Sequence, residues 1–417
     1  MKKVIISGMI GNALEWYDFA LYGHFAMILS KLFFPTFDPY VGTLATYTVF
    51  AAGFVMRPIG ALIFGYIGDK YGRRTALCAS ILMMAIPTGC IGLLPTYASI
   101  GIWAPILLAF IRLLQGASIG GEFSGCIAFL VEFSPMKKRG LVGSASMVSL
   151  CAGMLLGSIV ATAVSKLMPQ ADFESWGWRI PFLIGILIGL VGIYVRLNLH
   201  ESPVYLKAKA HNDLSRAPVR EVFKEHCKDL FIGIGLYLTV TVPFYTFTIF
   251  IKTFMSNTLG YSYFDSLTVN LICITVAMLV MPFSAWLSDL YGRKIVMKYS
   301  AYAFIVLIYP VFWLLTSGGY TSALISQLIF ALLVGFYMGP VPAALVELFP
   351  TRIRFTGVGL SYNISAGLFG GSAPLVGTWL IAQTGRPDSM ALYIILFAVA
   401  TLITLRYYTE TYRKPLS

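Results

Sequence analysis

Gly65-Tyr-Ile-Gly-Asp69-Lys-Tyr-Gly72-Arg73-Arg74 closes a long apolar segment early in the chain. Its second part, Asp-x-x-Gly-Arg followed by a basic residue, returns 220 residues later as Asp289-x-x-Gly292-Arg293-Lys294, again directly after an apolar segment. Because the chain has 417 residues, the two copies occupy corresponding places in its two halves. The sequence therefore indicates an internal duplication.

A second pair of motifs supports the duplication. Glu132-x-x-Pro135-x-x-x-Arg139 recurs 215 residues later as Glu347-x-x-Pro350-x-x-x-Arg354, in each half two apolar segments after the first motif. Many secondary transporters are built from two such repeats, with the substrate held between bundles that rock about it. The duplication thus predicts a mechanism as well as a fold.

The composition places the chain in a membrane. Hydrophobic residues make up 58% of it, charged residues only 12%, and the mean hydropathy is +0.79, which no soluble protein of this size could accommodate. A bilayer core of roughly 30 Å needs about 20 apolar residues as a helix. We therefore predict an all-α membrane protein with 12 transmembrane helices in two pseudo-symmetric six-helix bundles. The twelve stretches lie at about residues 7–33, 41–67, 75–95, 101–131, 141–166, 179–198, 230–254, 264–287, 295–315, 320–346, 355–383 and 389–407.

A polar stretch divides these segments into two groups of six. We expect an N-terminal bundle at 1–198, a cytoplasmic linker at 199–229 and a C-terminal bundle at 230–417. With the N-terminus inside, 23 of the 30 Lys and Arg residues fall in cytoplasmic segments, seven of them from Arg196 to Lys228. The positive-inside rule then places both termini in the cytoplasm, and a bacterial inner membrane is the expected location. The first span follows Met1, Lys2 and Lys3 directly, so we expect no cleavable leader.

Five charged residues lie deep within the predicted spans, where an ionised group costs roughly 2.5–3.5 kcal/mol. They are Glu15, Asp18, Arg57, Arg112 and Glu122. Glu15, Asp18 and Tyr22 share one face of the first helix, which Arg57 and Arg112 could meet. Three acids against two arginines leave one acid in excess, so we expect Asp18 or Glu15 to carry a proton. The alternative, which applies most to Glu122, is a permanent ion-paired lock between helices.

Four further motifs lie in or beside the predicted spans of the first half. They are Gly11-Asn12-Ala-Leu-Glu15-Trp16-Tyr17-Asp18-Phe19, Met56-Arg57-Pro58-Ile-Gly60, Arg112-Leu-Leu-Gln115-Gly116-x-x-x-Gly120-Gly121-Glu122 and Trp176-Gly177-Trp178-Arg179-Ile-Pro181-Phe182. Together with the loop 65–74, they resemble the major facilitator superfamily and, within it, the metabolite:proton symporter family. The proline and glycine-betaine permease branch is the most similar in shape, although shikimate, citrate and oxoglutarate carriers share the motifs. One member of the branch has a C-terminal coiled coil that has no counterpart here, so osmotic gating of that kind is not expected.

The resemblance implies a substrate pocket between helices 1, 4, 7 and 10 and a latch for the outward-facing state at the cytoplasmic mouth. Aromatic faces in the pocket suit a quaternary ammonium group, and Arg57 or Arg112 would bind a carboxylate. The pocket residues are then Asn12, Trp16, Tyr22, Gln115, Tyr245, Phe247 and Tyr337. The gating residues are Asp69, Arg73, Arg74, Glu132, Arg139, Asp289, Arg293, Glu347 and Arg354.

The sequence thus predicts proton-coupled symport of a small zwitterion such as proline or glycine betaine, or of an organic acid. A drug:proton antiporter and a non-transporting sensor are the alternatives, and the fifth span lacks the proline of antiporter motifs at Gly153-Met-Leu-Leu-Gly157-Ser158. No nucleotide loop, metal-ligand spacing or catalytic motif is present, so we expect neither an enzyme nor a cofactor. The expected partners are the substrate, the proton and the lipid bilayer. Nucleic acid is not expected despite the net charge of +12, and the chain is expected to be a monomer.

Overall fold

The computed structural model describes residues 2–35 and 39–416, and the described residues are helical almost throughout. The N-terminal half contains α1 (Lys2–Phe33), α2 (Pro39–Lys70), α3 (Arg73–Leu93), α4 (Tyr97–Ile100), α5 (Trp103–Phe133), η1 (Met136–Lys138), α6 (Arg139–Gly143), α7 (Ala145–Leu167), α8 (Gln170–Asp172), η2 (Phe173–Gly177) and α9 (Arg179–Leu197). Between the halves lie α10 (Pro203–Ala210) and α11 (Pro218–Glu225). The C-terminal half contains α12 (Cys227–Tyr245), η3 (Thr246–Phe250), α13 (Ile251–Asn257), α14 (Tyr263–Tyr291), α15 (Arg293–Thr316), α16 (Tyr320–Met338), α17 (Val341–Leu348), η4 (Thr351–Ile353), α18 (Arg354–Ile364), η5 (Ser365–Gly370), α19 (Ala373–Thr384) and α20 (Ser389–Tyr407).

Eleven of these helices or helix runs are long and apolar enough to cross a bilayer, counted over the described residues. The twelfth expected span is α1, which has 32 residues but is made less apolar by Asn12, Glu15 and Asp18. The helix that falls short in hydropathy therefore carries two of the five charged residues expected deep in the spans, Glu15 and Asp18.

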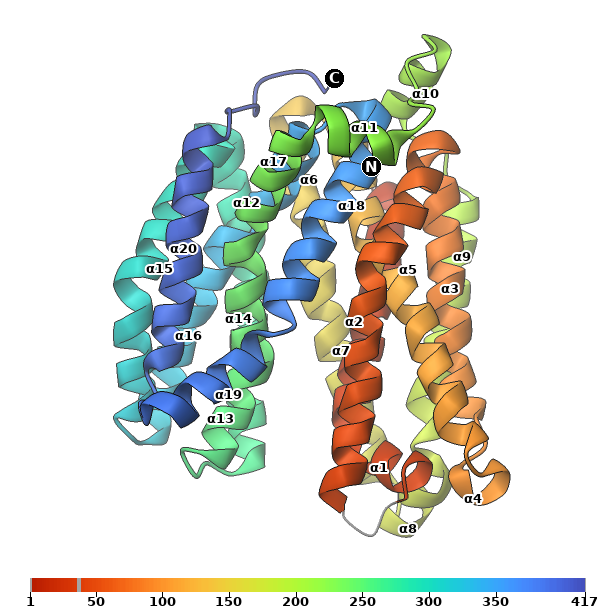
Figure 1. Ribbon diagram of the computed structural model, residues 1–417, viewed down its shortest axis with the longest axis vertical. Helices are drawn as coiled ribbons and strands as arrows, with labels where there is room; N and C mark the ends of the chain where they lie inside the picture. The colour runs from red at the N-terminus through yellow and green to blue at the C-terminus, as the bar shows by residue number, and fades with distance from the viewer. Residues whose placement is uncertain (1, 36–38, 417) are drawn as a thin grey trace.

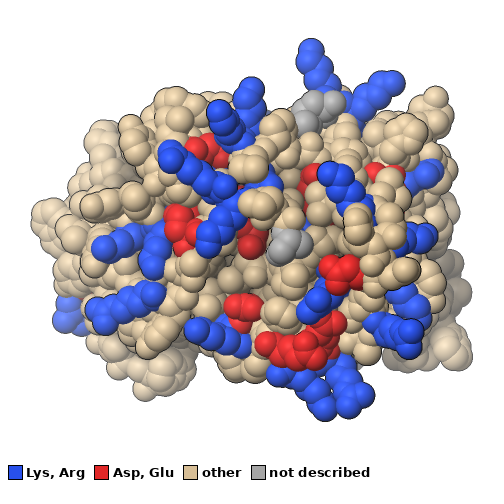
Figure 2. All heavy atoms as spheres, turned by 90° about the horizontal axis from the view of Figure 1, so that it is seen from above, with Lys and Arg blue, Asp and Glu red and all other residues tan. Residues whose placement is uncertain are grey.

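The helices form two bundles that meet along the middle of the molecule (Figure 1). Both termini, α10 and α11 lie at one end, which we call the terminus face, and α4 and α8 lie at the other end, the distal face (Figure 1). Across the middle, α18 packs against α2 and α5, while α14 packs against α6 and α7. Figure 2 shows the terminus face, where many Lys and Arg side chains are spread among fewer Asp and Glu.

Two expected spans are interrupted. The span expected at 230–254 consists of α12, a π-helical segment η3 and α13, and the one at 355–383 consists of α18, a second π-helical segment η5 and α19. Pro243, inside α12, lacks the N–H that a regular helix requires. π-Helical segments inside helices frequently mark functional sites, and each of these two begins within three residues of a side chain that binds Arg57 in the cavity wall described below.

Candidate functional site

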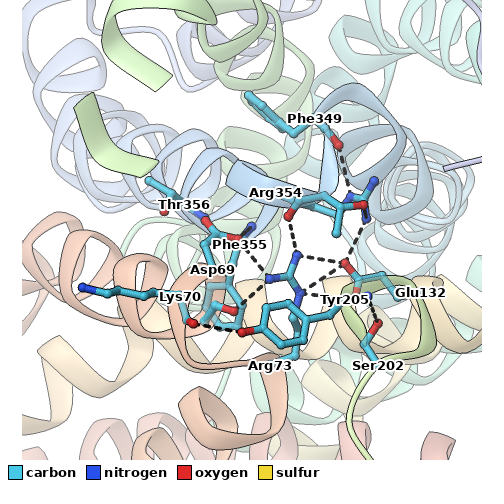
Figure 3. A network of polar contacts seen from close by, with 12 residues as sticks. Asp69, Lys70, Arg73, Glu132, Ser202, Tyr205, Phe349, Arg354, Phe355 and Thr356 are labelled. Atoms are coloured by element: carbon cyan, nitrogen blue, oxygen red, sulfur yellow. Dashed lines mark hydrogen bonds and ion pairs between the residues drawn. The ribbon is translucent and has the colours of Figure 1, made fainter. Parts of the chain in front are cut away.

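Asp69, at the end of α2, caps a helix of the opposite half (Figure 3). Its Oδ1 accepts a hydrogen bond from the backbone N–H of Phe355 at 3.0 Å, and its Oδ2 accepts one from Thr356 at 2.9 Å. These N–H groups belong to the first turn of α18 and have no partner within their own helix. The carboxylate also faces the positive end of the helix dipole, so Asp69 binds α18 by charge as well as by hydrogen bonds.

A buried cluster surrounds this cap at the terminus face (Figure 3). Glu132 at the end of α5 lies 3.1 Å from Arg73 Nη2 and 2.9 Å from Arg354 Nη1. Arg73 also donates to the Thr351 carbonyl at 2.6 Å and lies 3.2 Å from Asp69. Since Arg354 and Thr351 belong to the C-terminal half, the cluster joins the two bundles. We call Asp69, Arg73, Glu132 and Arg354 the first latch.

The repeat of the motifs places a second latch on the other side of the interface. Asp289 accepts hydrogen bonds from the backbone N–H groups of Gly140 and Leu141, each at 2.9 Å, in the first turn of α6. Arg293 lies 2.7 Å from Asp289 and 3.3 Å from Glu347, and Arg139 lies 3.6 Å from Glu347. Asp289, Arg293, Glu347 and Arg139 therefore repeat the first latch with the two halves exchanged.

Two glutamates that the motifs did not indicate support these latches. Glu201 accepts hydrogen bonds from the backbone N–H of Arg73 at 3.1 Å and of Arg74, and Glu410 accepts one from Lys294 N at 2.8 Å. The chain enters α3 and α15 through Gly72 and Gly292, whose φ of 109° and 104° L side chains rarely adopt. The sequence contains a signal for the pair, because Glu201-Ser202 and Glu410-Thr411 each follow the last span of a half.

Arg74 differs from the other expected gating residues. Its Nε donates to the Arg196 carbonyl at 3.2 Å, and its Nη2 donates to the Leu197 carbonyl. Both contacts lie within the N-terminal half, so the side chain ties α3 to α9 rather than one bundle to the other.

A small cavity lies deeper, between α1, α2 and α5. Its volume is about 20 Å³, which is close to the space one water molecule occupies. The lining residues are Glu15, Trp16, Asp18, Phe19, Gly53, Phe54, Arg57, Arg112, Gln115, Gly116 and Ile119. They include two of the expected acids, both expected arginines, Trp16 and Gln115.

Asp18 and Arg112 form a buried ion pair at the cavity wall, with 2.6 Å between Oδ2 and Nη1. The Asp18 carboxylate also accepts hydrogen bonds from Gln115 Nε2 at 2.9 Å and Thr88 Oγ1 at 3.0 Å. The Arg112 guanidinium lies 3.7 Å from the centre of the Tyr22 ring. This acid is therefore held by one charged and two neutral donors.

Arg57 has its partners in the opposite half, not on the acids of α1. It donates hydrogen bonds to the hydroxyl groups of Tyr245 at 3.0 Å and Tyr362 at 2.5 Å, and to Asn363 Oδ1 at 3.3 Å. Tyr245 ends α12, just before η3, and Tyr362 and Asn363 lie close before η5. Arg57 therefore links the cavity to both interrupted helices. Sequence reasoning did not select Tyr362 and Asn363.

Glu15 has no such partner. Its Oε2 is buried and accepts no hydrogen bond from any residue that the structure describes. Burying a carboxylate without a positive partner is costly. Of the acids expected deep in the spans, Glu15 is thus the one whose charge is not offset by an ion pair with a described residue.

Glu122 lies apart from the cavity and forms an ion pair with Arg196. Its Oε2 accepts hydrogen bonds from Arg196 Nη1 at 2.8 Å and Ser80 Oγ at 2.6 Å. Arg196, counted from the sequence among the cytoplasmic basic residues, lies in the last turn of α9 and is only 1% exposed. The count of three acids against two arginines did not include Arg196, which is the ion-pair partner of Glu122.

The expected substrate residues separate into two groups. Trp16 and Gln115 line the cavity, Tyr22 lies against Arg112, and Tyr245 binds Arg57. The other three are placed within the bundles: Asn12 Nδ2 donates to the Ser146 carbonyl at 2.6 Å, the Phe247 ring lies 5.4 Å from that of Phe330, and the Tyr337 hydroxyl donates to the Leu236 carbonyl at 2.8 Å.

Two aromatic residues of the cavity wall were not selected from the sequence. The Phe19 ring lies 5.1 Å from Trp16 and 6.2 Å from Phe54, and Phe54 lies 6.0 Å from Tyr245. Phe19 ends the motif that begins at Gly11, and that position is the signal that could have identified it.

Sequence comparison relates the chain to known transporters. The family described as sugar (and other) transporter matches residues 4–226, and the one described as MFS/sugar transport protein matches residues 126–348. The glycine betaine/proline/ectoine/pipecolic acid transporter of Dickeya dadantii is 37% identical, and the proline/betaine transporter of Escherichia coli K12 is 36% identical. Each match covers all of this chain and 85% of the relative.

Structure comparison gives the same fold. The proton:xylose symporter bound to 6-bromo-6-deoxy-D-glucose matches with a TM-score of 0.83 at 18% identity, over 99% of this chain and 97% of that chain. An inward-open form of the Escherichia coli xylose transporter matches over the same shares with a TM-score of 0.67, at 17% identity. The match in fold over 99% of this chain confirms the predicted architecture of two helical bundles.

Proposed function

Because this chain belongs to the sugar (and other) transporter family of the major facilitator superfamily, in its metabolite:proton symporter branch, we propose that it carries a small zwitterion inward together with a proton. The compounds named for the relatives, glycine betaine and proline, are both zwitterions. The observation that carries the proposal is the cavity in which Glu15, without an ion pair, and Arg57, bound by the opposite bundle, share one wall.

The charges of the cavity suit a zwitterion better than a multiply charged acid. Asp18 and Arg112 offset each other, which leaves Arg57 to bind a substrate carboxylate. The rings of Trp16 and Phe19 supply aromatic faces for a cationic nitrogen. Citrate or oxoglutarate would bring a further negative charge toward the buried acids without a further cation to receive it. We therefore favour a zwitterion over an organic acid.

We assign the proton to Glu15. A buried carboxylate without a partner needs a proton or a cation to offset its charge, whereas Asp18 has Arg112 and Glu122 has Arg196. While Glu15 holds a proton, no anion competes for Arg57, and a substrate carboxylate can bind there. When Glu15 loses the proton, its charge competes with that carboxylate. Proton and substrate therefore bind cooperatively, which is the coupling that symport requires.

Arg57 also connects substrate binding to the movement of the bundles. Its three partners, Tyr245, Tyr362 and Asn363, belong to the C-terminal half. A carboxylate bound to Arg57 would replace some of these bonds. A cavity of about 20 Å³ holds no zwitterion of this kind, so binding requires the bundles to separate around it.

We place the terminus face in the cytoplasm of a bacterial inner membrane. The many exposed Lys and Arg residues of this face support that orientation (Figure 2). The two latches then close the transporter to the cytoplasm.

Transport by purified protein in proteoliposomes tests the proposal. With an imposed inward proton gradient, we expect accumulation of glycine betaine or proline, and none of shikimate, citrate or oxoglutarate. Glu15→Gln should abolish gradient-driven accumulation but retain counterflow, because the substrate site stays intact without the titrating group. Asp18→Asn is the matched variant, and we expect it to impair counterflow as well, since it leaves Arg112 without its ion-pair partner.

Two results would overturn the assignments. Accumulation in Glu15→Gln at the wild-type level would remove Glu15 from the coupling mechanism. Efflux of a cationic dye, with no uptake of any of the five compounds, would contradict symport and favour the antiporter.

A further inference from the structure

Two neighbouring residues of α1 that line the cavity each have a buried polar atom without a hydrogen-bond partner among the described residues. Glu15 Oε2 is an acceptor and Trp16 Nε1 is a donor, and neither has a hydrogen-bond partner within residues 2–35 and 39–416. Nearly all buried polar atoms in proteins are hydrogen-bonded, so each exception requires an explanation. The mechanism above accounts for Glu15 and leaves the indole N–H of Trp16 without a role.

We propose that the Trp16 N–H donates a hydrogen bond to the substrate carboxylate, beside Arg57, and makes Trp16 a specificity-determining residue for carboxylated zwitterions. The inference rests on the proposed function and specifies how its site selects a substrate. Trp16 is 2% exposed and lines the same cavity as Arg57. The donor therefore has no solvent to bond, and a ligand in the cavity is the partner that the site offers.

The packing around Trp16 fixes its ring close to the Arg57 site. The Phe244 ring lies edge-on to it at 5.5 Å, and the Tyr245 ring lies 6.4 Å away. The Tyr245 hydroxyl in turn accepts a hydrogen bond from Arg57. The indole and the guanidinium thus share an aromatic neighbour, and together they present one neutral and one charged donor to a planar carboxylate.

Binding of glycine betaine and of choline to the purified protein separates this role from ring packing. Choline has the same trimethylammonium group but an alcohol in place of the carboxylate. Trp16→Phe keeps an aromatic face and removes the N–H. We expect it to weaken glycine betaine binding roughly tenfold or more, the size of a hydrogen bond to a charged group, and to leave choline binding nearly unchanged.

Trp178→Phe is the matched control. Trp178 is also fully buried, and its Nε1 likewise has no partner in the part of the chain that the structure describes, but its ring packs against Phe33 at 5.9 Å, away from the cavity. We expect this variant to keep the wild-type ratio of glycine betaine to choline affinity. Trp16→His, which restores a ring N–H, should recover part of the preference.

An unchanged ratio in folded Trp16→Phe, judged by gel filtration and melting temperature, would overturn the inference. If that variant does not fold, difference Raman spectra of the wild-type protein report the indole N–H directly, and spectra unaffected by glycine betaine would overturn it equally. Failure of the wild-type protein to bind glycine betaine at all would instead count against the proposed function.

Discussion

Glu201 shows how one side chain outside the spans sets the pH response of a latch. Burial raises the pKa of its carboxyl above the ordinary value of 4.5, against the backbone hydrogen bonds from Ser202 and Arg74, which lower it. A carboxyl group whose pKa is raised on folding contributes stability below its unfolded value, and this contribution is lost as pH rises through the folded value. Above about pH 4.5, the melting temperature of the wild type should therefore fall as this contribution is lost, and we expect Glu201→Gln, which keeps an accepting oxygen, to reduce that fall.

Glu201→Ala is the contrasting variant, because it leaves the N–H groups of Arg73 and Arg74 without this acceptor. We expect it to lower the free energy of unfolding by about 1–3 kcal/mol. A Gln variant whose melting temperature follows the wild type at every pH would show that the Glu201 carboxyl does not titrate in this range.

Single residues were predictable where the sequence places charge deep in a span, and not where partners come from distant segments. The cost of burying Asp18 and Arg112 indicated that such groups would pair, and they do. Nothing local indicates that Arg57 bonds Tyr362, 305 residues away. The pairing of Arg196 with Glu122 was not predicted, because Arg196 stands at the end of its span, where a basic residue is usually solvated.

At the scale of helices, the approach of α2 to α5 depends on a glycine. A Cβ added to Gly60 would overlap the backbone of Ala117. Small residues allow such close contacts between transmembrane helices. We expect Gly60→Ala to lower the free energy of unfolding by roughly 1–3 kcal/mol, as overpacking does, measured as a lower melting temperature in detergent.

Gly23→Ala in α1 is the control, because a Cβ there would meet no heavy atom within 4 Å. It should leave the melting temperature unchanged or raise it, since alanine favours a helix more than glycine does. Equal losses in both variants would show that the contact between α2 and α5 is not the cause.

Apolar length predicted where helices run, but not where they break. The π-helical segments η3 and η5 interrupt spans that apolar length alone predicts to be continuous helices. Pro243 is the local signal for the first break, and the glycines at 367, 370 and 371 accompany the second. Because apolar periodicity measures burial rather than hydrogen-bond pattern, it cannot distinguish a π-helical turn from an α-helical one.

The whole molecule was the most predictable level, since two motifs repeated at corresponding places require two similar halves. The conformation was not predictable, because every state of a rocking transporter uses the same sequence. What the structure adds is that both latches are formed together. Each depends on an aspartate capping a helix of the opposite bundle, Asp69 on α18 and Asp289 on α6.

This arrangement predicts that each of the two latches stabilises the closed form of the terminus face. Tyr71 and Tyr291 are equivalent positions in the repeat, and their side chains are 58% and 61% exposed, so spin labels there report the separation of the halves. We expect Asp69→Asn and Asp289→Asn each to increase the population with a longer label distance. Losing a charged partner costs about 1.5–3 kcal/mol, so each shift should be roughly tenfold or more in the ratio of open to closed forms.

A variant that carries both Asp69→Asn and Asp289→Asn tests whether the two latches stabilise the same closed state. If both latches hold one rigid-body closure, the two free energies add, and the open form dominates. Asp388→Asn, which removes an ion pair with Arg386 on the distal face, should leave the label distances unchanged. A distance distribution that stays at the wild-type value in the double variant would mean that packing of α2 against α18, rather than the charges, keeps this face closed.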